Sequence, residues 1–156
     1  MISVDTELSG RDLAAELESL LKKVNQLADS VASLLYKKIG DNWDAGRDPW
    51  GAPWTPLAAS TIEARRRRNV QGIMPLIDTG KMRSSLKIVK SADGVSLQVE
   101  FPAEIHQRGG RSPQRKIFPI TAQGEPDLPD SWEKDIEEVT ETWLRMLVDQ
   151  SPSLTR

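Results

Sequence analysis

The sequence of 156 residues contains no cysteine and a single histidine, His106. The absence of cysteine excludes disulfide scaffolds, thiolate zinc sites, iron–sulfur clusters and thiol nucleophiles. One histidine also excludes metal sites that need two or more imidazole ligands. Because no run of 18 apolar residues occurs, we expect no transmembrane helix. The first residues lack the basic and then apolar pattern of a signal peptide, so these absences together predict a soluble, intracellular domain.

Catalytic signatures are also scarce, and we expect neither enzyme activity nor a cofactor or metal. His106 lies two residues from Glu104, and side chains at that spacing do not face each other on a helix. No nucleophile is evident beside His106, which favours a structural hydrogen bond or an interface role over catalysis. The tripeptide Asp78-Thr79-Gly80 resembles a fragment of an aspartic-protease site, but no second carboxylate stands in a similar setting. We therefore interpret it as a helix cap.

Charge is balanced over the whole chain but uneven along it. The net charge is −2, from 21 bases and 23 acids, which disfavours a globally basic nucleic-acid binder. Residues 61–90 contain eight bases and two acids, whereas residues 121–150 contain nine acids and two bases. These surfaces either lie near each other in one monomer or join successive copies in a ring or stack. The run Arg65–Arg68 is interpretable as a solvated helix end, a contact for an acidic protein, or a phosphate contact.

Residues 9–39 are predicted to form one long amphipathic helix, which Gly40 is expected to end. Its apolar residues follow an unbroken heptad pattern, formed by Leu13, Leu17, Leu20, Val24, Leu27, Val31 and Leu34. At roughly 1.5 Å per residue such a rod measures about 45 Å, more than a domain of this size needs. The helix therefore either lies across its own sheet or also packs against a neighbouring subunit.

A loop rich in tryptophan, proline and glycine is predicted over residues 41–56. It leads into a second helix over 56–69, with Thr55 as the cap. The basic residues at the end of this helix suit the negative end of the helix dipole. A further short helix is expected to begin with Asp78 or Thr79 as its cap.

An antiparallel hairpin is predicted by two alternating stretches, 86–91 and 95–101, around the turn residues Asp93-Gly94. A short helical segment over 102–108 follows. Residues 116–121 predict one more strand, which Pro119 would place at a sheet edge.

The last predicted helix covers residues 131–149, with Asp130 as its cap and an apolar stripe of Ile136, Val139, Trp143 and Leu147. The predicted fold class is α+β: a long N-terminal helix packed on a small antiparallel sheet, with a second helix and a C-terminal helix. We assign residues 1–156 to one domain. Within it, 8–39 form the long helix, 41–121 the α+β core and 130–150 the C-terminal helix.

Five short motifs follow one another between residues 41 and 120. The first is Pro49-Trp50-Gly51 with Trp54, Pro56 and Leu57, and the second is Thr61 with Arg65–Arg67. The third runs from Leu76 to Ser85. The fourth combines Ala103, His106, Gln107, Gly109 and Gly110, and the fifth combines Pro113, Arg115 and Phe118. In this order they resemble the motifs of the phage virion morphogenesis family, which includes the tail-completion proteins of Mu-like and P2-like phages.

The resemblance implies a structural role at the head–tail junction or tail end of a virion. We expect a homo-oligomeric ring, with six copies as a candidate number, that docks on other neck, connector or tail proteins. Genomic DNA would pass through the ring without specific binding, and no membrane would be involved. The protein would reside in the virion neck or tail, and in the bacterial host cytoplasm during assembly. One alternative is a morphogenesis factor that the finished virion does not retain, and a second is a nucleic-acid-binding module.

Two sets of candidate residues follow, the first from the resemblance and the second from the local concentration of positive charge. The structural motif or interface set comprises Trp50, Trp54, Asp78, Thr79, Gly80, Arg83, His106, Gln107, Gly109 and Arg115. The candidate docking charges are Arg65, Arg66, Arg67, Arg68, Arg108, Arg111 and Lys116.

Overall fold

The computed structural model describes residues 10–70, 72–91 and 94–149 of the chain. In order, its elements are α1 (Gly10–Asp44), α2 (Ala59–Arg67), α3 (Lys81–Ser84), β1 (Lys87–Ser91), β2 (Gly94–Gln98), α4 (Ala103–Arg108) and α5 (Asp130–Asp149). A long N-terminal helix, a two-stranded antiparallel sheet and a C-terminal helix confirm the predicted α+β class. Residues 8, 9 and 150 of the predicted helices, and Asp93 of the predicted turn, lie outside the described residues.

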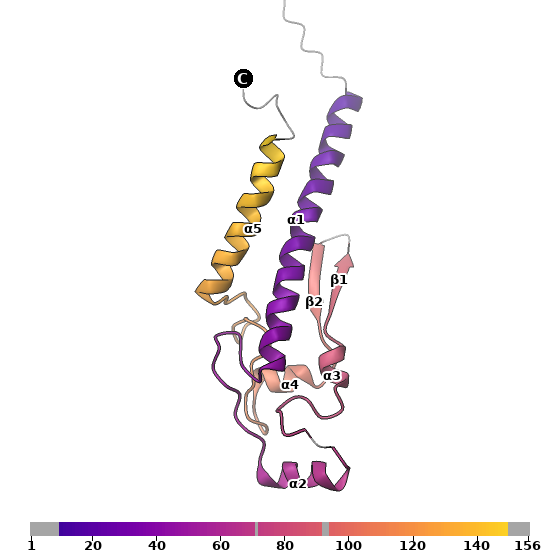
Figure 1. The fold of residues 1–156 in the computed structure, drawn as a ribbon. Coiled ribbons are helices and arrows are strands. Elements are labelled where there is room, and N and C mark those ends of the chain that lie inside the picture. The colour runs from indigo at the N-terminus through magenta and orange to yellow at the C-terminus, as the bar shows by residue number, and fades with distance from the viewer. Residues whose placement is uncertain (1–9, 71, 92–93, 150–156) are drawn as a thin grey trace, which may run out of the picture.

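The molecule is built along α1, with α5 on one side of it and the β1–β2 hairpin on the other (Figure 1). The strands pair antiparallel with Lys87 opposite Gln98 and Ser91 opposite Gly94. Helices α2, α3 and α4, with the loops between them, gather at the C-terminal end of α1 (Figure 1). We call this end the base. The opposite end, where α1 begins and α5 finishes, is called the tip.

The buried core lies in the base. It comprises Ile39, Trp43, Trp54, Leu76, Leu86, Ala103, Ile117 and Trp132. Trp43 and Trp54 meet edge to face, with ring centroids 6.2 Å apart and an interplanar angle of 82°. This arrangement places the positive ring edge of one indole against the negative face of the other. Loops that are far apart in the sequence are thereby held around the last turns of α1.

Helix α1 does not end at Gly40, as predicted, but continues to Asp44. One further helical turn after Ile39 carries the Trp43 side chain into the core, where only 1% of it is exposed. Gly40 has a different function: a Cβ at this position would lie 2.7 Å from Nη2 of Arg83. The missing side chain therefore lets the Arg83 guanidinium pass against the helix.

The predicted caps of the next two helices are wrong. Helix α2 begins at Ala59 after Ala58, because the carbonyls of Thr55 and Pro56 accept hydrogen bonds from the Arg115 guanidinium instead of from a helical turn. Helix α3 follows Gly80, whose φ of 78° suits a residue without a Cβ. Asp78 instead forms ion pairs with arginines of the α2 region.

The predicted strand over 116–121 is also absent from the described structure, where only Ile120 forms an isolated bridge, to Pro126. The side chain of Gln107 takes the place of a partner strand. Its Oε1 accepts hydrogen bonds from the backbone N–H groups of Ile117 and Phe118 at 2.6 and 2.9 Å. Its Nε2 donates to the carbonyl of Phe118 at 2.9 Å. One amide side chain therefore satisfies three backbone groups that a sheet would otherwise pair.

The hairpin, the helical segment α4 and the C-terminal helix confirm their predictions with small shifts of boundary. Asp130 is the first helical residue and not the cap, since the carbonyl of Pro129 accepts from the N–H groups of Trp132 and Glu133. The predicted apolar stripe of α5 is half-buried. Trp143 on this stripe donates a hydrogen bond from its Nε1 to the carbonyl of Lys23 at 3.1 Å.

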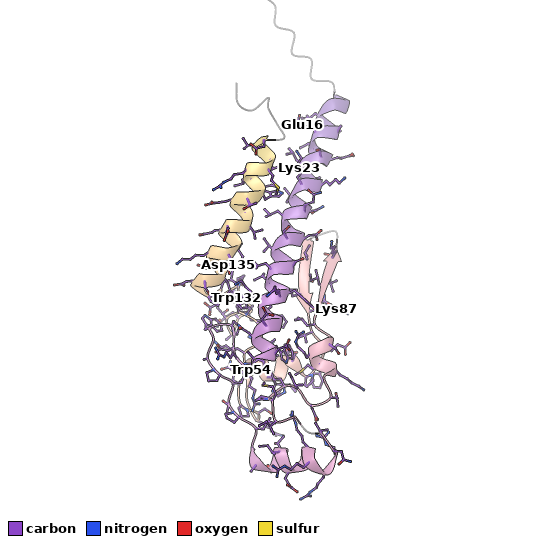
Figure 2. All side chains as sticks on the ribbon, viewed as in Figure 1. Glu16, Lys23, Trp54, Lys87, Trp132 and Asp135 are labelled. Atoms are coloured by element: carbon purple, nitrogen blue, oxygen red, sulfur yellow. The ribbon has the colours of Figure 1, made fainter. Side chains whose placement is uncertain are left out.

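Near the base, α5 is fixed to α1 by the Lys38 side chain. Lys38 pairs with Asp135, and its Nζ lies 5.6 Å from the ring centroid of Trp132. Figure 2 shows Trp132 and Asp135 at the start of α5, and Lys23 further along α1 toward the tip. The two helices are therefore joined at both Lys38 and Lys23.

We expect Trp43→Ala to lower the free energy of unfolding by about 3–5 kcal/mol, because it empties the best buried position of the core. Ile73→Ala is the control, since Ile73 is 68% exposed and its loss should change stability by less than about 0.5 kcal/mol. Urea denaturation of both variants measures the difference. Equal effects would contradict the assignment of the core to the base.

Candidate interaction surfaces

Arg65 is the centre of a buried polar cluster in the base. Only 5% of the residue is exposed, and its Nη1 donates to the carbonyls of Gly72, Met74 and Ile77 at 2.9, 3.0 and 2.8 Å. Its Nε lies 3.7 Å from Oδ1 of Asp78. The prediction of Arg65 as a docking charge is therefore wrong, because the guanidinium is occupied in holding its own chain.

Asp78 joins this cluster to the protein surface. Its Oδ2 accepts from Nη2 of the exposed Arg68 at 3.0 Å, while its Oδ1 faces Arg65. Thr79 accepts only a long hydrogen bond, 3.5 Å, from the N–H of Lys81. The Asp-Thr-Gly motif thus connects α2 to α3 through Asp78 and the turn at Gly80.

Arg115 is the second buried arginine, also 5% exposed. Its Nε and Nη2 donate to the carbonyls of Thr55 and Pro56 at 2.9 and 3.2 Å, and its backbone N–H donates to the carbonyl of His106 at 2.8 Å. Burial, and then the nearby charge of Arg65, lower the pKa of Arg115. Arg115 therefore links the first, fourth and fifth sequence motifs from within the base.

His106 lies beside Arg115 and is half-buried. Burial, and then the charge of Arg115, lower the pKa of His106 below its usual value of about 6.5. The imidazole is therefore neutral near neutral pH. Its Nδ1 is buried and finds no hydrogen-bond partner in the described part of the chain.

The tryptophan loop packs onto the same region. Trp54 is buried and donates from Nε1 to the carbonyl of Lys116 at 3.0 Å. The neighbouring Trp50 is more exposed, and Nζ of Lys116 lies 4.7 Å from its ring centroid. Lys116 is thus engaged in a cation–π contact within its own chain. Gly109 ends α4 with φ 79°, and a Cβ there would lie 3.0 Å from Cβ of Gln114.

Arg83 stands apart from this cluster. Its Nε and Nη2 donate to the two carboxylate oxygens of Asp44, both at 2.9 Å. This forked pair raises the pKa of Arg83 and joins α3 to the last turn of α1. The structure therefore gives Arg83 a role in fixing α1.

Five of the predicted docking charges lie on the surface: Arg66, Arg67, Arg68, Arg108 and Arg111. Arg67 and Arg108 pair with the acids four residues before them, Glu63 and Glu104. Such exposed pairs are weak and leave the charge accessible.

The tip carries a large exposed apolar surface. Leu13, Leu17, Leu20, Leu21 and Val24 of α1 are each between 48% and 63% exposed, and Leu144, Met146 and Val148 of α5 between 48% and 50%. Contiguous apolar surface of this kind marks an interaction site in soluble proteins. The heptad predicted these α1 residues except Leu21, but the α5 residues were missed. They lie off the predicted stripe, with Leu144 and Val148 along one flank of it and Met146 along the other.

Over residues 10–70, 72–91 and 94–149, no group of His, Asp and Glu side chains is arranged to hold a metal ion. Among the helices in those ranges, none has the length and apolar character needed to cross a membrane.

The sequence model of the phage virion morphogenesis family matches residues 8–145, which is most of the chain. The chain belongs to the phage virion morphogenesis family. This membership confirms the predicted resemblance and associates the protein with phage virion assembly. Neither a curated protein nor a solved structure matches the chain.

The residues that carried the resemblance to the phage virion morphogenesis family fall into two groups in space. Trp54, Gln107 and Arg115 form hydrogen bonds that hold the loops of the base together. The basic side chains of the same motifs that remain exposed, such as Arg66 and Arg67, lie on the surface. Most of the motif residues therefore build the fold, and only a minority are free to contact a partner.

We expect Arg65→Met to lower the free energy of unfolding by about 3–5 kcal/mol, because it removes three hydrogen bonds to backbone carbonyls and leaves Asp78 without its buried partner. The adjacent exposed residue supplies the control, Arg66→Met, which should change stability by less than about 0.5 kcal/mol. Urea denaturation distinguishes the two. If Arg65→Met were as mild as the control, Arg65 would not anchor the loop.

The lowered pKa of His106 predicts a pH dependence of stability. The folded protein binds the proton more weakly than the unfolded chain, so the contribution is complete above about pH 6.5 and is lost as the pH falls toward the lower folded pKa. Between about pH 7 and pH 5, the free energy of unfolding should therefore fall more steeply for the wild type than for His106→Gln. Parallel slopes in urea denaturation series would show that His106 titrates alike in both states.

Proposed function

We propose that the protein is a structural component of the virion, at the head–tail junction or the tail end. Copies join through the tip to form a ring, and the ring docks on neighbouring neck, connector or tail proteins. It is not an enzyme in this proposal, and DNA passes through the ring without specific binding. The observation that carries the proposal is the exposed apolar surface of the tip.

The pattern of the tip favours a second copy of this chain as the occupant. The lower half of the α1 heptad, Leu27, Val31 and Leu34, is half-buried within the chain. Its upper half continues the same spacing but is exposed. An apolar seam with heptad spacing packs best against another helix. Every neighbouring copy of the chain brings its own α1 and α5, which are helices of this kind. Helices from adjacent copies can therefore complete at the tip the packing that begins inside each subunit.

The distribution of charge supports a ring over a simple pair. Five exposed arginines lie around α2 and α4 in the base: Arg66, Arg67, Arg68, Arg108 and Arg111. Helix α5 exposes more acids, among them Glu133, Glu137, Glu138 and Glu141, than bases, Lys134 and Arg145. Opposite charges on different faces suit a head-to-tail contact, and such a contact closes into a ring when the rotation between copies permits. Six copies remain the candidate number implied by the family resemblance.

The burial of Arg65 weakens the nucleic-acid alternative, because this member of the basic run donates to backbone carbonyls of its own chain. The other alternative, an assembly factor that leaves before completion, is tested by mass spectrometry of purified phage particles. Presence of the chain in stoichiometric amount supports the virion component, whereas its absence supports the assembly factor.

We expect light scattering to give a mass several times the 17.4 kDa of the monomer, and Leu17→Glu with Leu20→Glu to reduce it to the monomer. The added carboxylates would have to be buried in the contact between copies, which is costly. Ser19→Glu adds one carboxylate to α1 at an exposed position off the heptad and should leave the mass unchanged. A wild-type protein that stays monomeric at every concentration contradicts association through the tip.

A further inference from the structure

A groove of about 780 Å³ opens in the base, between the segment that precedes α2 and the loops around α3 and α4. Its walls are largely apolar, and include Leu57, Met82, Phe101 and Pro113. Phe101 is 78% exposed, which is unusual for an aromatic side chain with no partner in the described structure. Arg65, Arg115 and His106 also line this groove.

The two buried arginines of the groove have too few carboxylates. Among the described residues, the partners of the Arg115 guanidinium are two carbonyl oxygens, and no carboxylate pairs with it. Arg65 has the carboxylate of Asp78, but shares it with Arg68. A buried guanidinium without a counter-charge is unfavourable, so this site is electrostatically suited to an anion.

The net charge of the side chains that line the groove indicates the charge of the anion. The groove is lined by three basic side chains, Arg65, Lys81 and Arg115, and by two acidic ones, Asp78 and Glu100. His106, whose pKa is lowered, adds no charge to this sum near neutral pH. One positive charge is therefore in excess, and one carboxylate balances it.

We infer that this groove binds an acidic side chain, Asp or Glu, on an apolar segment of a neighbouring protein of the virion. The carboxylate pairs with the Arg115 guanidinium, whose Nη1 has no partner among the described residues and is not one of the buried unpaired atoms. The residues on either side of it pack on the apolar walls around Phe101. This inference rests on the proposed function for the kind of partner.

Two observations favour a peptide over phosphate. The acidic Asp78 and Glu100 of the lining repel a polyanion, whereas the apolar walls suit side chains. Oδ1 of Asp78 is buried without a hydrogen-bond partner in the described part of the chain, and a peptide offers backbone N–H donors that phosphate lacks.

The position of the groove favours a different protein over a second copy. It lies in the base, at the opposite end of α1 from the tip (Figure 1). The proposed apolar contacts between copies occupy the tip, and none of the exposed arginines proposed to face the next copy lines the groove. The groove therefore remains open to the next component of the assembly.

The test uses the full-length chain and the peptide Ac-Leu-Glu-Leu-NH2, with Ac-Leu-Gln-Leu-NH2 and inorganic phosphate as comparisons. His106 is the only histidine in the sequence, so its imidazole resonances report on the groove without ambiguity. The Glu peptide should shift these resonances saturably and bind at least tenfold more tightly than the Gln peptide and phosphate. Equal binding of the two peptides, or tighter binding of phosphate, overturns the inference.

Arg115→Lys keeps the charge but removes the guanidinium fork, and should weaken binding of the Glu peptide about tenfold. Arg47→Lys is the matched control, because Arg47 is exposed and does not line the groove. If Arg115→Lys does not fold, comparing the Glu peptide with the Gln peptide and phosphate on the wild type still tests whether the groove binds a carboxylate. Equal affinities of both folded variants overturn the role of Arg115.

Repeating the titration with the Leu17→Glu, Leu20→Glu variant separates the two proposals. Retained binding in a monomeric variant shows that the groove does not depend on the ring. A wild type that is monomeric but binds the Glu peptide contradicts the ring alone, and a ring that does not bind it contradicts the groove alone.

Discussion

The base depends on hydrogen bonds from a few buried side chains to backbone groups that no helix or strand pairs. Between α2 and α5 the chain forms one two-stranded hairpin and two short helices. Most of its remaining carbonyl and N–H groups must still be satisfied when they are buried. Arg65, Gln107 and Arg115 do this by reaching several backbone groups each. Guanidinium and amide side chains suit the task because each has several donors or acceptors in a fixed plane.

Regular periodicity made part of this fold predictable. The α1 heptad, the alternation of the hairpin and the stripe of α5 each reflect a repeat in side-chain direction, and their elements are present. The family resemblance likewise rested on local motifs and is confirmed by the match over most of the chain. These signals are short-range, and a single sequence contains them directly.

The remaining features arise from contacts between distant segments. A glycine at position 40 is typical of a helix end. Here it lies inside the helix, because a Cβ at this position would collide with the Arg83 guanidinium. Arg65 belongs to a run of four arginines, and only the loop folding back over it distinguishes it from Arg66. Residues 116–121 are rich in apolar side chains and suggest a strand, yet the side chain of Gln107, from α4, satisfies the backbone N–H groups of Ile117 and Phe118. In each case the partner lies beyond the window in which a pattern can be recognised.

The forked pair between Arg83 and Asp44 also sets the direction in which the tip faces. It holds the last turn of α1, and the turn is seated by Gly40, so the helix is not free to rotate about its own axis. From Asp44 to Leu17 the rod extends about 40 Å at roughly 1.5 Å per residue. Over such a lever, each degree of tilt at the base displaces the leucines by about 0.7 Å, nearly half the rise of one helical residue. A small adjustment of the base on its neighbour therefore becomes a large movement where copies would meet. The Arg83–Asp44 pair and the buried Trp43 together determine how firmly the base holds α1.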